Sequence, residues 1–160
     1  MKTINYPIRL SLHLALGATL ALILAGCASR TKSVPVTLAD VSGPARATLE
    51  KVTAGGRVDR IDKEVEKGKL VYDVEATVGG KHVEYLIDDA DGVVLGTETS
   101  IEFGELPQPV RDAAQKYFGG ATGLKAMKGV EYGQTSYEIE GMRKGKTVEV
   151  TFAPDGKRTE

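Results

Sequence analysis

The end of the chain shows the clearest alternation of apolar and polar positions. Between residues 137 and 152, two short runs place an apolar residue or a glycine at every second position and polar residues between them. This period of two is typical of strands that bury one face. Gly145 lies between the runs, where a two-residue hairpin turn requires a positive φ, and Asp155-Gly156 is a common turn pair. The pattern predicts a hairpin followed by a second turn.

The same alternation predicts further strands upstream. A hairpin is expected from Lys69–Thr77 and Lys81–Asp88, with Tyr72, Val74 and Ile87 among its buried side chains. Weaker alternation predicts strands at Arg57–Glu66, Gly123–Tyr132, Val93–Leu95 with an extension over Thr97–Phe103, and a short final strand at 156–160.

Two amphipathic helices are predicted, one before each set of strands. Apolar residues recur at helical spacing over 106–118, with prolines at the start and Gly119-Gly120 as the stop. An earlier stripe covers 41–52, where Ser42 is a candidate N-cap and Gly55-Gly56 is the expected end. Helices this short need a sheet to pack on.

A repeat relates these two sets of elements. Sliding the chain by 65 positions aligns, without a gap, the pairs Pro44/Pro109, Arg46/Arg111, Gly55/Gly120, Gly68/Gly133, Tyr72/Tyr137, Gly80/Gly145 and Glu84/Glu149. Shared turn glycines reflect backbone geometry rather than composition, which favours a tandem duplication over a chance alignment.

The expected fold class is therefore α+β. Two α-β-β-β(-β) repeats, 36–100 and 101–160, are predicted to form an antiparallel sheet with both helices packed on one face. The charged series of the strands is expected on the opposite, solvated face.

Residues 1–26 are not expected to belong to the fold. A positively charged start precedes an apolar run that is too short for a membrane span and is typical of a secretory signal. The run ends in Leu24-Ala25-Gly26-Cys27, which looks like a lipobox, so Cys27 is the predicted lipidation site. An uncleaved anchor helix and an ordinary signal with a chance cysteine are the alternatives. With Ala28 after the cysteine, the outer membrane, facing the periplasm, is favoured over the inner membrane.

Residues 27–35 are predicted to form a tether between the lipid and the domain. The chain has 21 Lys and Arg against 22 Asp and Glu, so no basic excess favours nucleic acid as a partner. Cys27 is the single cysteine, and an exported domain without a second one must be stable without disulfides. Apart from the lipid on Cys27, no cofactor is expected.

Several motifs, clearest in the second repeat, resemble those of a known family. The segments Leu106-Pro107 before Val110, Tyr137-Glu138-Ile139-Glu140, Gly145-Lys146, Val148-Glu149-Val150 and Asp155-Gly156-Lys157 together resemble PepSY-like domains. The resemblance covers 36–160, is strongest in 104–157 and is weaker in the first copy. Such domains are similar in fold to the beta-lactamase inhibitor protein family, itself a tandem duplication. The resemblance implies a non-enzymatic, extracytoplasmic module that binds or inhibits a protein, such as a protease, and it supplies no catalytic residue.

Two patterns suggest ligand binding, each with a simpler structural interpretation. Gly141–Thr147 looks like a phosphate-binding loop, but one residue is missing and the segment is expected in a hairpin turn. Asp89, Asp91 and Glu98 have part of the spacing of a calcium loop, although Ile87 stands at the first ligand position. A solvated turn is the alternative, and no metal is the main expectation.

A polar series on the predicted sheet face is the candidate binding site. With the expected register, one face carries Asp73, Glu75, His82, Glu84, Glu138, Glu140, Thr147, Glu149 and Thr151. This face is expected either to be a solvated surface, with Lys63 and Lys128 pairing across, or to dock a basic or polar protein surface. Tyr85, Tyr132 and Met142 are candidate anchors if they point outward.

Enzyme activity is not expected. His82 could act as a base beside Glu84, but no motif places a Ser or Cys nucleophile near it. The sequence favours a membrane-anchored extracytoplasmic lipoprotein with a PepSY-like binding or inhibitory module that acts on a protease or another envelope protein. A scaffold lipoprotein in an envelope assembly complex is the alternative.

Overall fold

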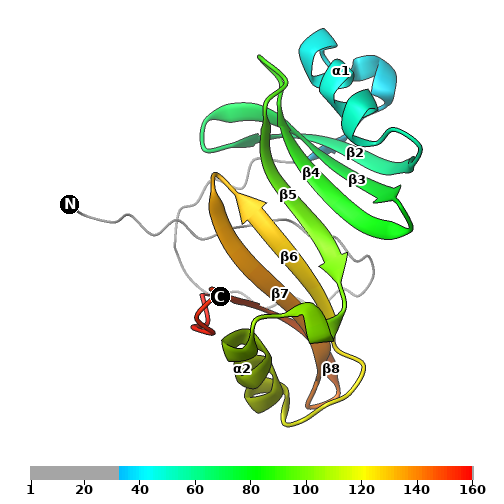
Figure 1. Ribbon diagram of the computed structural model, residues 1–160. Helices are drawn as coiled ribbons and strands as arrows, with labels where there is room; N and C mark the ends of the chain where they lie inside the picture. The colour runs from blue at the N-terminus through cyan, green and yellow to red at the C-terminus, as the bar shows by residue number, and fades with distance from the viewer. Residues whose placement is uncertain (1–32, 160) are drawn as a thin grey trace, which may run out of the picture.

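The computed structural model describes residues 33–159. An eight-stranded antiparallel sheet forms its centre, with the strands lying side by side in the order of the chain (Figure 1). The strands are β1 Val34–Pro35, β2 Arg57–Glu66, β3 Lys69–Val78, β4 Lys81–Asp88, β5 Val94–Ile101, β6 Lys125–Glu131, β7 Gln134–Arg143 and β8 Lys146–Phe152. The helices described are η1 Leu38–Asp40, α1 Gly43–Val52, η2 Phe103–Glu105 and α2 Gln108–Phe118. The α+β class with an antiparallel sheet is confirmed.

Both α-helices pack on the same face of the sheet. Residues directly opposite one another in paired strands point to the same side, and the pairs Val74/Tyr85, Tyr85/Thr97 and Thr97/Val130 carry this face from β3 to β6. The α1 core contains Val41, Ala45, Leu49, Ile61, Tyr72, Val74 and Ile87. The α2 core contains Leu106, Val110, Ala114, Phe118, Ala126, Tyr137, Ile139, Val150 and Phe152. Figure 1 shows α1 beside the first strands and α2 beside the last ones.

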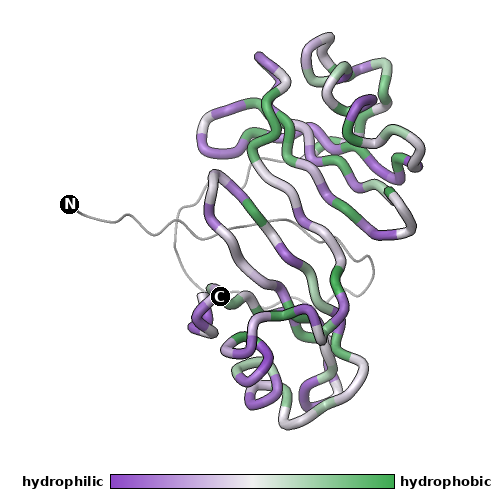
Figure 2. The backbone as a smooth tube through the Cα atoms, viewed as in Figure 1, coloured by the Kyte–Doolittle hydropathy of each residue, from purple (hydrophilic) through white to green (hydrophobic). Residues whose placement is uncertain are grey.

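Two-residue turns, with positive φ at both positions, join the two strands of each of four hairpins. They are Lys67-Gly68, Gly79-Gly80, Tyr132-Gly133 and Lys144-Gly145. Such turns match the natural twist of the strands they join. The predicted positive φ of Gly145 is confirmed, at 76°. In Figure 2 hydrophilic and hydrophobic stretches alternate along the strands that these turns connect.

Elements of the first half recur in the second half with the same spacing. β3 starts at residue 69 and β7 at residue 134, and each is ten residues long. Arg46 donates hydrogen bonds to the carbonyls of Ala39 and Val41 at 2.7 and 3.1 Å. Arg111, 65 positions later, donates to the carbonyls of Gly104 and Leu106 at the same distances.

Ser42 is the N-cap residue of the first helix, as predicted, whereas the end of the helix differs from its prediction. α1 ends at Val52, with Thr53 as the C-cap residue, so it does not reach Gly55-Gly56. Ser42 precedes the helix as expected, but its side chain does not cap it. The hydroxyl instead donates to the carbonyl of Asp89 at 2.7 Å, because the turn after β4 packs against the start of the helix.

The ends of the described chain also differ from expectation. Val34–Pro35, predicted within the tether, pair with β2 and form its short neighbour β1. In place of a final strand at 156–160, the described residues form a single bridge between Phe152 and Arg158. The predicted signal peptide, Cys27 and the first part of the tether lie outside the described residues. Within 33–159, no helix is long and apolar enough to cross a membrane.

Candidate functional site

The sheet face opposite the helices carries all nine predicted binding residues. The register places Glu75 opposite Glu84 and Glu140 opposite Glu149 on this side. We call it the acidic face. Besides His82, Thr147 and Thr151, it carries the carboxyl residues Asp62, Glu64, Glu66, Asp73, Glu75, Glu84, Asp88, Glu98, Glu131, Glu138, Glu140 and Glu149.

Six carboxyl groups of this face were missed by the sequence reasoning. Three of them, Asp62, Glu64 and Glu66, alternate along β2, whose pattern is blurred by charges on both sides of the strand. Glu98 was assigned to the calcium-like spacing, whereas Asp88 and Glu131 are the last residues of β4 and of the weakly patterned β6. Strict alternation within the correctly predicted limits of β2 could have found its three acids.

The acidic face is not fully solvated, contrary to the prediction. The exposed fractions of its most buried carboxyl residues are 5% for Asp62, 9% for Asp73, 2% for Glu84, 4% for Asp88, 6% for Glu98 and 3% for Glu131. Two apolar residues on the same side, Val71 and Leu86, are also almost completely buried. These residues must therefore be covered by other parts of the protein.

Contact between two hairpin turns accounts for part of this burial. The Lys67 ammonium lies 3.0 Å from a Glu131 carboxylate oxygen and 3.7 Å from the centre of the Tyr132 ring. These turns belong to β2–β3 and β6–β7, and β3 and β6 would lie about 14 Å apart in a flat sheet. Because the contact is made by acidic-face side chains, the sheet must curl toward this face at that end.

The carboxyl groups of Glu66 and Glu131 share this contact. Burial raises the pKa of Glu66 to about 7, helped by a hydrogen bond and charge repulsion from Glu131, while Lys67 lowers it. Near neutral pH Glu66 is therefore protonated for part of the time, and the Lys67 ammonium lies beside both carboxyl groups.

Replacing Lys67 by asparagine is expected to destabilise the fold by about 1–2 kcal/mol near pH 8, because Glu131 would lose its cation while buried. Asparagine tolerates the positive φ of this turn position. Near pH 5 the loss should be smaller, since Glu66 is then protonated. Urea unfolding at both pH values measures the effect. Lys144→Asn, at an exposed turn position of similar φ, is the control. Equal losses for both variants would contradict the assigned contact.

The centre of the acidic face holds protonated carboxyl groups. Burial raises the pKa of Asp73 to about 8, with repulsion from neighbouring carboxylates led by Glu84. Burial likewise raises the pKa of Glu98 to about 9, with repulsion led by Glu138. At pH 7 both groups are mainly neutral and can donate a hydrogen bond. The face is therefore less negative at its centre than its composition suggests.

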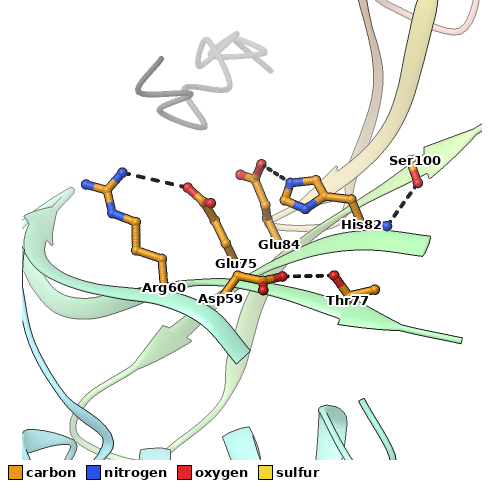
Figure 3. A network of polar contacts seen from close by, with 7 residues as sticks. All are labelled: Asp59, Arg60, Glu75, Thr77, His82, Glu84 and Ser100. Atoms are coloured by element: carbon orange, nitrogen blue, oxygen red, sulfur yellow. Dashed lines mark hydrogen bonds and ion pairs between the residues drawn. The ribbon is translucent and has the colours of Figure 1, made fainter. Parts of the chain in front are cut away.

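Cations on the acidic face differ from those predicted. Arg60 lies 2.6 Å from Asp62 and 3.9 Å from Glu75. Figure 3 shows Arg60 and Glu75 beside Glu84, whose carboxylate lies 3.0 Å from the His82 ring. At the other end of the face, Lys125 pairs with Glu140 at 2.7 Å.

Lys63 and Lys128 do not pair across the acidic face. Their positions in the register, opposite Tyr72 and Tyr137, put both side chains on the helix side of the sheet. Lys63 lies with its ammonium 5.5 Å from the centre of the Tyr72 ring. Each lysine alternates with the acidic-face residues of its own strand, which is why it points away from them.

The three candidate anchors have different surroundings. Met142 lies on the acidic face, opposite Thr147, and is 56% exposed. Tyr132 is partly exposed in its turn, with Lys67 over its ring. Tyr85 points to the helix side, where its hydroxyl donates to the carbonyl of Val52 at 3.2 Å, so it is not an outward anchor.

The calcium-like residues are not brought together. Asp89 accepts a hydrogen bond from the Tyr72 hydroxyl at 2.6 Å, and Asp91 accepts one from the backbone of Val93 at 3.0 Å. Glu98 lies in the middle of β5, opposite Glu84. Among residues 33–159, no group of three or more acidic, His or Cys side chains has metal-binding geometry.

The surroundings of His82 give no sign of a catalytic pair. Its ring contacts Glu84, whereas the hydroxyl of nearby Ser100 accepts a hydrogen bond from the His82 backbone at 3.2 Å. Figure 3 shows this separation of the two contacts. The arrangement fits a polar binding surface better than an activated serine.

Part of the chain matches the model of a known protein family. Residues 45–98 match the PepSY family model. That family is described as "Peptidase propeptide and YPEB domain". The PepSY domain runs from α1 into β5, so the match falls on the first half of the chain. The sequence motifs had indicated 104–157 as the region of strongest resemblance.

A solved structure shares the general fold. A candidate periplasmic protein from Bacteroides eggerthii DSM 20697 is similar over 75% of this chain and 86% of its own, with a TM-score of 0.59. The sequences are 14% identical, so this similarity shows the fold alone. No curated protein matches the chain.

Proposed function

We propose that this protein is an extracytoplasmic lipoprotein, anchored through a lipid on Cys27, that binds and restrains a partner protein through the acidic face without catalysis. The gathering of polar and acidic side chains on one curled sheet face is the observation that carries the proposal. The PepSY domain and the periplasmic neighbour fit an extracytoplasmic module. A protease or another envelope protein is the proposed class of target.

The distribution of charge indicates how the face would recognise a partner. Glu75, Glu138 and Glu149 remain partly or fully exposed, whereas Asp73 and Glu98 are buried. Exposed carboxylates steer a basic surface toward the face, since charge acts mainly on encounter and specificity. The buried Asp73 and Glu98 are mainly neutral at pH 7, so attraction of a basic partner falls to the exposed carboxylates around them. Met142, at 56% exposure, supplies an apolar contact.

We further propose that the domain arose by tandem duplication. The equal spacing of β3 and β7 and the matching contacts of Arg46 and Arg111 support this. At an offset of 65, β1 corresponds to part of β5, because Val34 faces Lys63 as Thr99 faces Lys128. The border between the units would then lie in the turn between β4 and β5, upstream of residue 100.

Capture from crosslinked envelope extract tests the binding role. The purified chain is compared with a Glu75→Lys/Glu138→Lys variant, which reverses two charges on the acidic face. A Glu50→Lys/Asp112→Lys variant, with the same charge change on exposed helix positions, is the control. We expect the wild type and the control to enrich the same protein and the face variant to lose at least tenfold of it.

Two outcomes would overturn this proposal. Equal capture by the folded face variant would exclude the acidic face as the binding site. Enrichment only of an integral membrane complex, equally by all three chains, would instead favour the scaffold function.

A further inference from the structure

β8 presents an unpaired edge over part of its length. Within residues 33–159, its side away from β7 is bonded near the end, where the Thr159 N–H donates to the Thr151 carbonyl at 2.9 Å. The Lys144-Gly145 turn makes Arg143 and Lys146 a hydrogen-bonded pair. From this pair onward, hydrogen-bonded and non-hydrogen-bonded residue pairs alternate along β7 and β8. The backbone groups of Thr147 and Glu149 therefore point away from β7, toward the unpaired side.

The counterpart of this edge is already paired within the same chain. β4 lies 65 positions before β8, and its corresponding residues are His82 and Glu84. β5 covers that side of β4 in antiparallel register, with Glu98 opposite Glu84. An antiparallel strand thus fits against this type of edge, and the same backbone geometry recurs at β8.

The opposite edge of the sheet is protected. Val34 faces Lys63, and the Val36 N–H bonds the Ile61 carbonyl at 2.9 Å, so Pro35 is turned to the outer side of β1. Proline has no N–H to donate there, a common way to block an edge strand. A second copy that placed its β1 on β8 would lack this donor. A second copy that placed its own β8 there would present Thr147, Glu149 and Thr151 on the acidic face, with no basic residue for Glu149. The occupant is therefore better sought in another protein.

The side chains along β8 define the chemistry of that occupant. Glu149 lies on the acidic face directly opposite Glu140, and like charges in this position repel. Val148 and Val150 lie on the helix side, half-buried and buried. A basic residue beside Glu149 would relieve the repulsion, and apolar residues on either side of it would extend the α2 core.

We infer that the edge of β8 binds an extended segment of a partner protein, antiparallel to β8, with a Lys or Arg opposite Glu149 flanked by apolar residues. Backbone hydrogen bonds to Thr147 and Glu149 would supply affinity, and the alternating side chains would supply specificity. This inference rests on the proposed function, because the segment is taken to belong to the same partner protein that the acidic face binds. The acidic face includes residues of β8 itself.

A synthetic peptide with the sequence Thr-Val-Lys-Val-Thr tests the edge directly. Amide hydrogen exchange of the purified chain is followed by NMR with and without saturating peptide. We expect at least tenfold slower exchange at Thr147 and Glu149, and weaker binding of a peptide with Glu in place of Lys. Thr147→Pro removes the outward donor and should weaken binding at least tenfold, whereas Lys144→Asn, in the exposed turn before β8, keeps the donor and should bind like the wild type.

The outcomes for the edge site can be told apart from those for the acidic face. Unchanged exchange at both amides, or equal peptide affinity of the folded Thr147→Pro and Lys144→Asn variants, would overturn the edge site. Exchange measured on the wild type decides the question even if the proline variant fails to fold. Peptide protection together with undiminished capture by Glu75→Lys/Glu138→Lys would leave the edge site standing and overturn the acidic face.

Discussion

Raising the pH from about 5 to about 9 is expected to lower the free energy of unfolding by several kcal/mol. Burial raises the pKa of Asp73 to about 8 and that of Glu98 to about 9. In the unfolded chain both carboxyl groups lose their protons near pH 4. The folded state therefore binds more protons than the unfolded state between these values, and its stability falls as the pH rises. Each tenfold difference in proton affinity corresponds to about 1.4 kcal/mol.

The neighbours of the two groups act in the same direction. Carboxylates of Glu84, Glu64, Glu75 and Asp62 surround Asp73, and those of Glu138, Glu84, Glu149 and Asp73 surround Glu98. Burial also raises the pKa of Glu84 and Glu149. Stability should be fully present below about pH 4 to 5, and should be lost progressively as these groups ionise.

Urea unfolding at pH 5, 7 and 9 measures this dependence, with an Asp73→Asn/Glu98→Gln variant as the comparison. The amides keep the shape of the neutral acids but cannot ionise, so the variant should be more stable than the wild type at pH 9. Its unfolding free energy should change less with pH. A wild-type stability that increases from pH 5 to pH 9 would contradict the burial of these carboxyl groups.

Replacing Gly92 by alanine is expected to destabilise the protein by about 3 kcal/mol or more. Gly92 has a φ of 71°, and an added Cβ would lie 2.4 Å from the carbonyl oxygen of Pro44. Both atoms are held in place, since the Thr48 hydroxyl donates to the Gly92 carbonyl at 2.7 Å. The alanine would have to separate the turn after β4 from the first turn of α1. Thermal and urea unfolding measure the loss.

Gly68→Ala provides a matched control for this effect. Gly68 has a similar φ of 79°, but an added Cβ would meet nothing within 4 Å. Its cost should be that of the left-handed conformation alone, about 1–2 kcal/mol. Equal losses at both glycines would show that close contact with Pro44 is unimportant. Gly156, 2.4 Å from the Pro109 carbonyl by the same measure, should behave like Gly92.

Local elements were predictable from the sequence because their signals are local. α2 ends at Phe118 with Gly119 in the left-handed conformation, as the Gly119-Gly120 pair predicted. β2 spans the predicted residues, and the hairpin turn at Gly145 is present. The grouping of the nine candidate residues on one face also followed from alternation, because a strand has a period of two.

Burial of the acidic face was not predictable in the same way. It depends on the curl of the sheet, and this is fixed by contacts such as that between Lys67 and Tyr132, which lie far apart in the sequence. Pairing of Val34–Pro35 with β2 involves two residues, too few to give a periodic signal. The early end of α1 reflects the conformation of Thr53, for which the later glycines were a misleading sign.

The order of the strands has a consequence for how the protein folds. β1 to β8 lie in the sheet in the order in which they occur in the chain, so strands that follow one another in the chain pair with each other. Contacts between sequence neighbours close short loops and form quickly. The sheet can therefore grow strand by strand from the N-terminal side as the chain is released from a ribosome or a translocation channel. Only one growing edge would then be exposed at any moment, which limits the opportunity for aggregation.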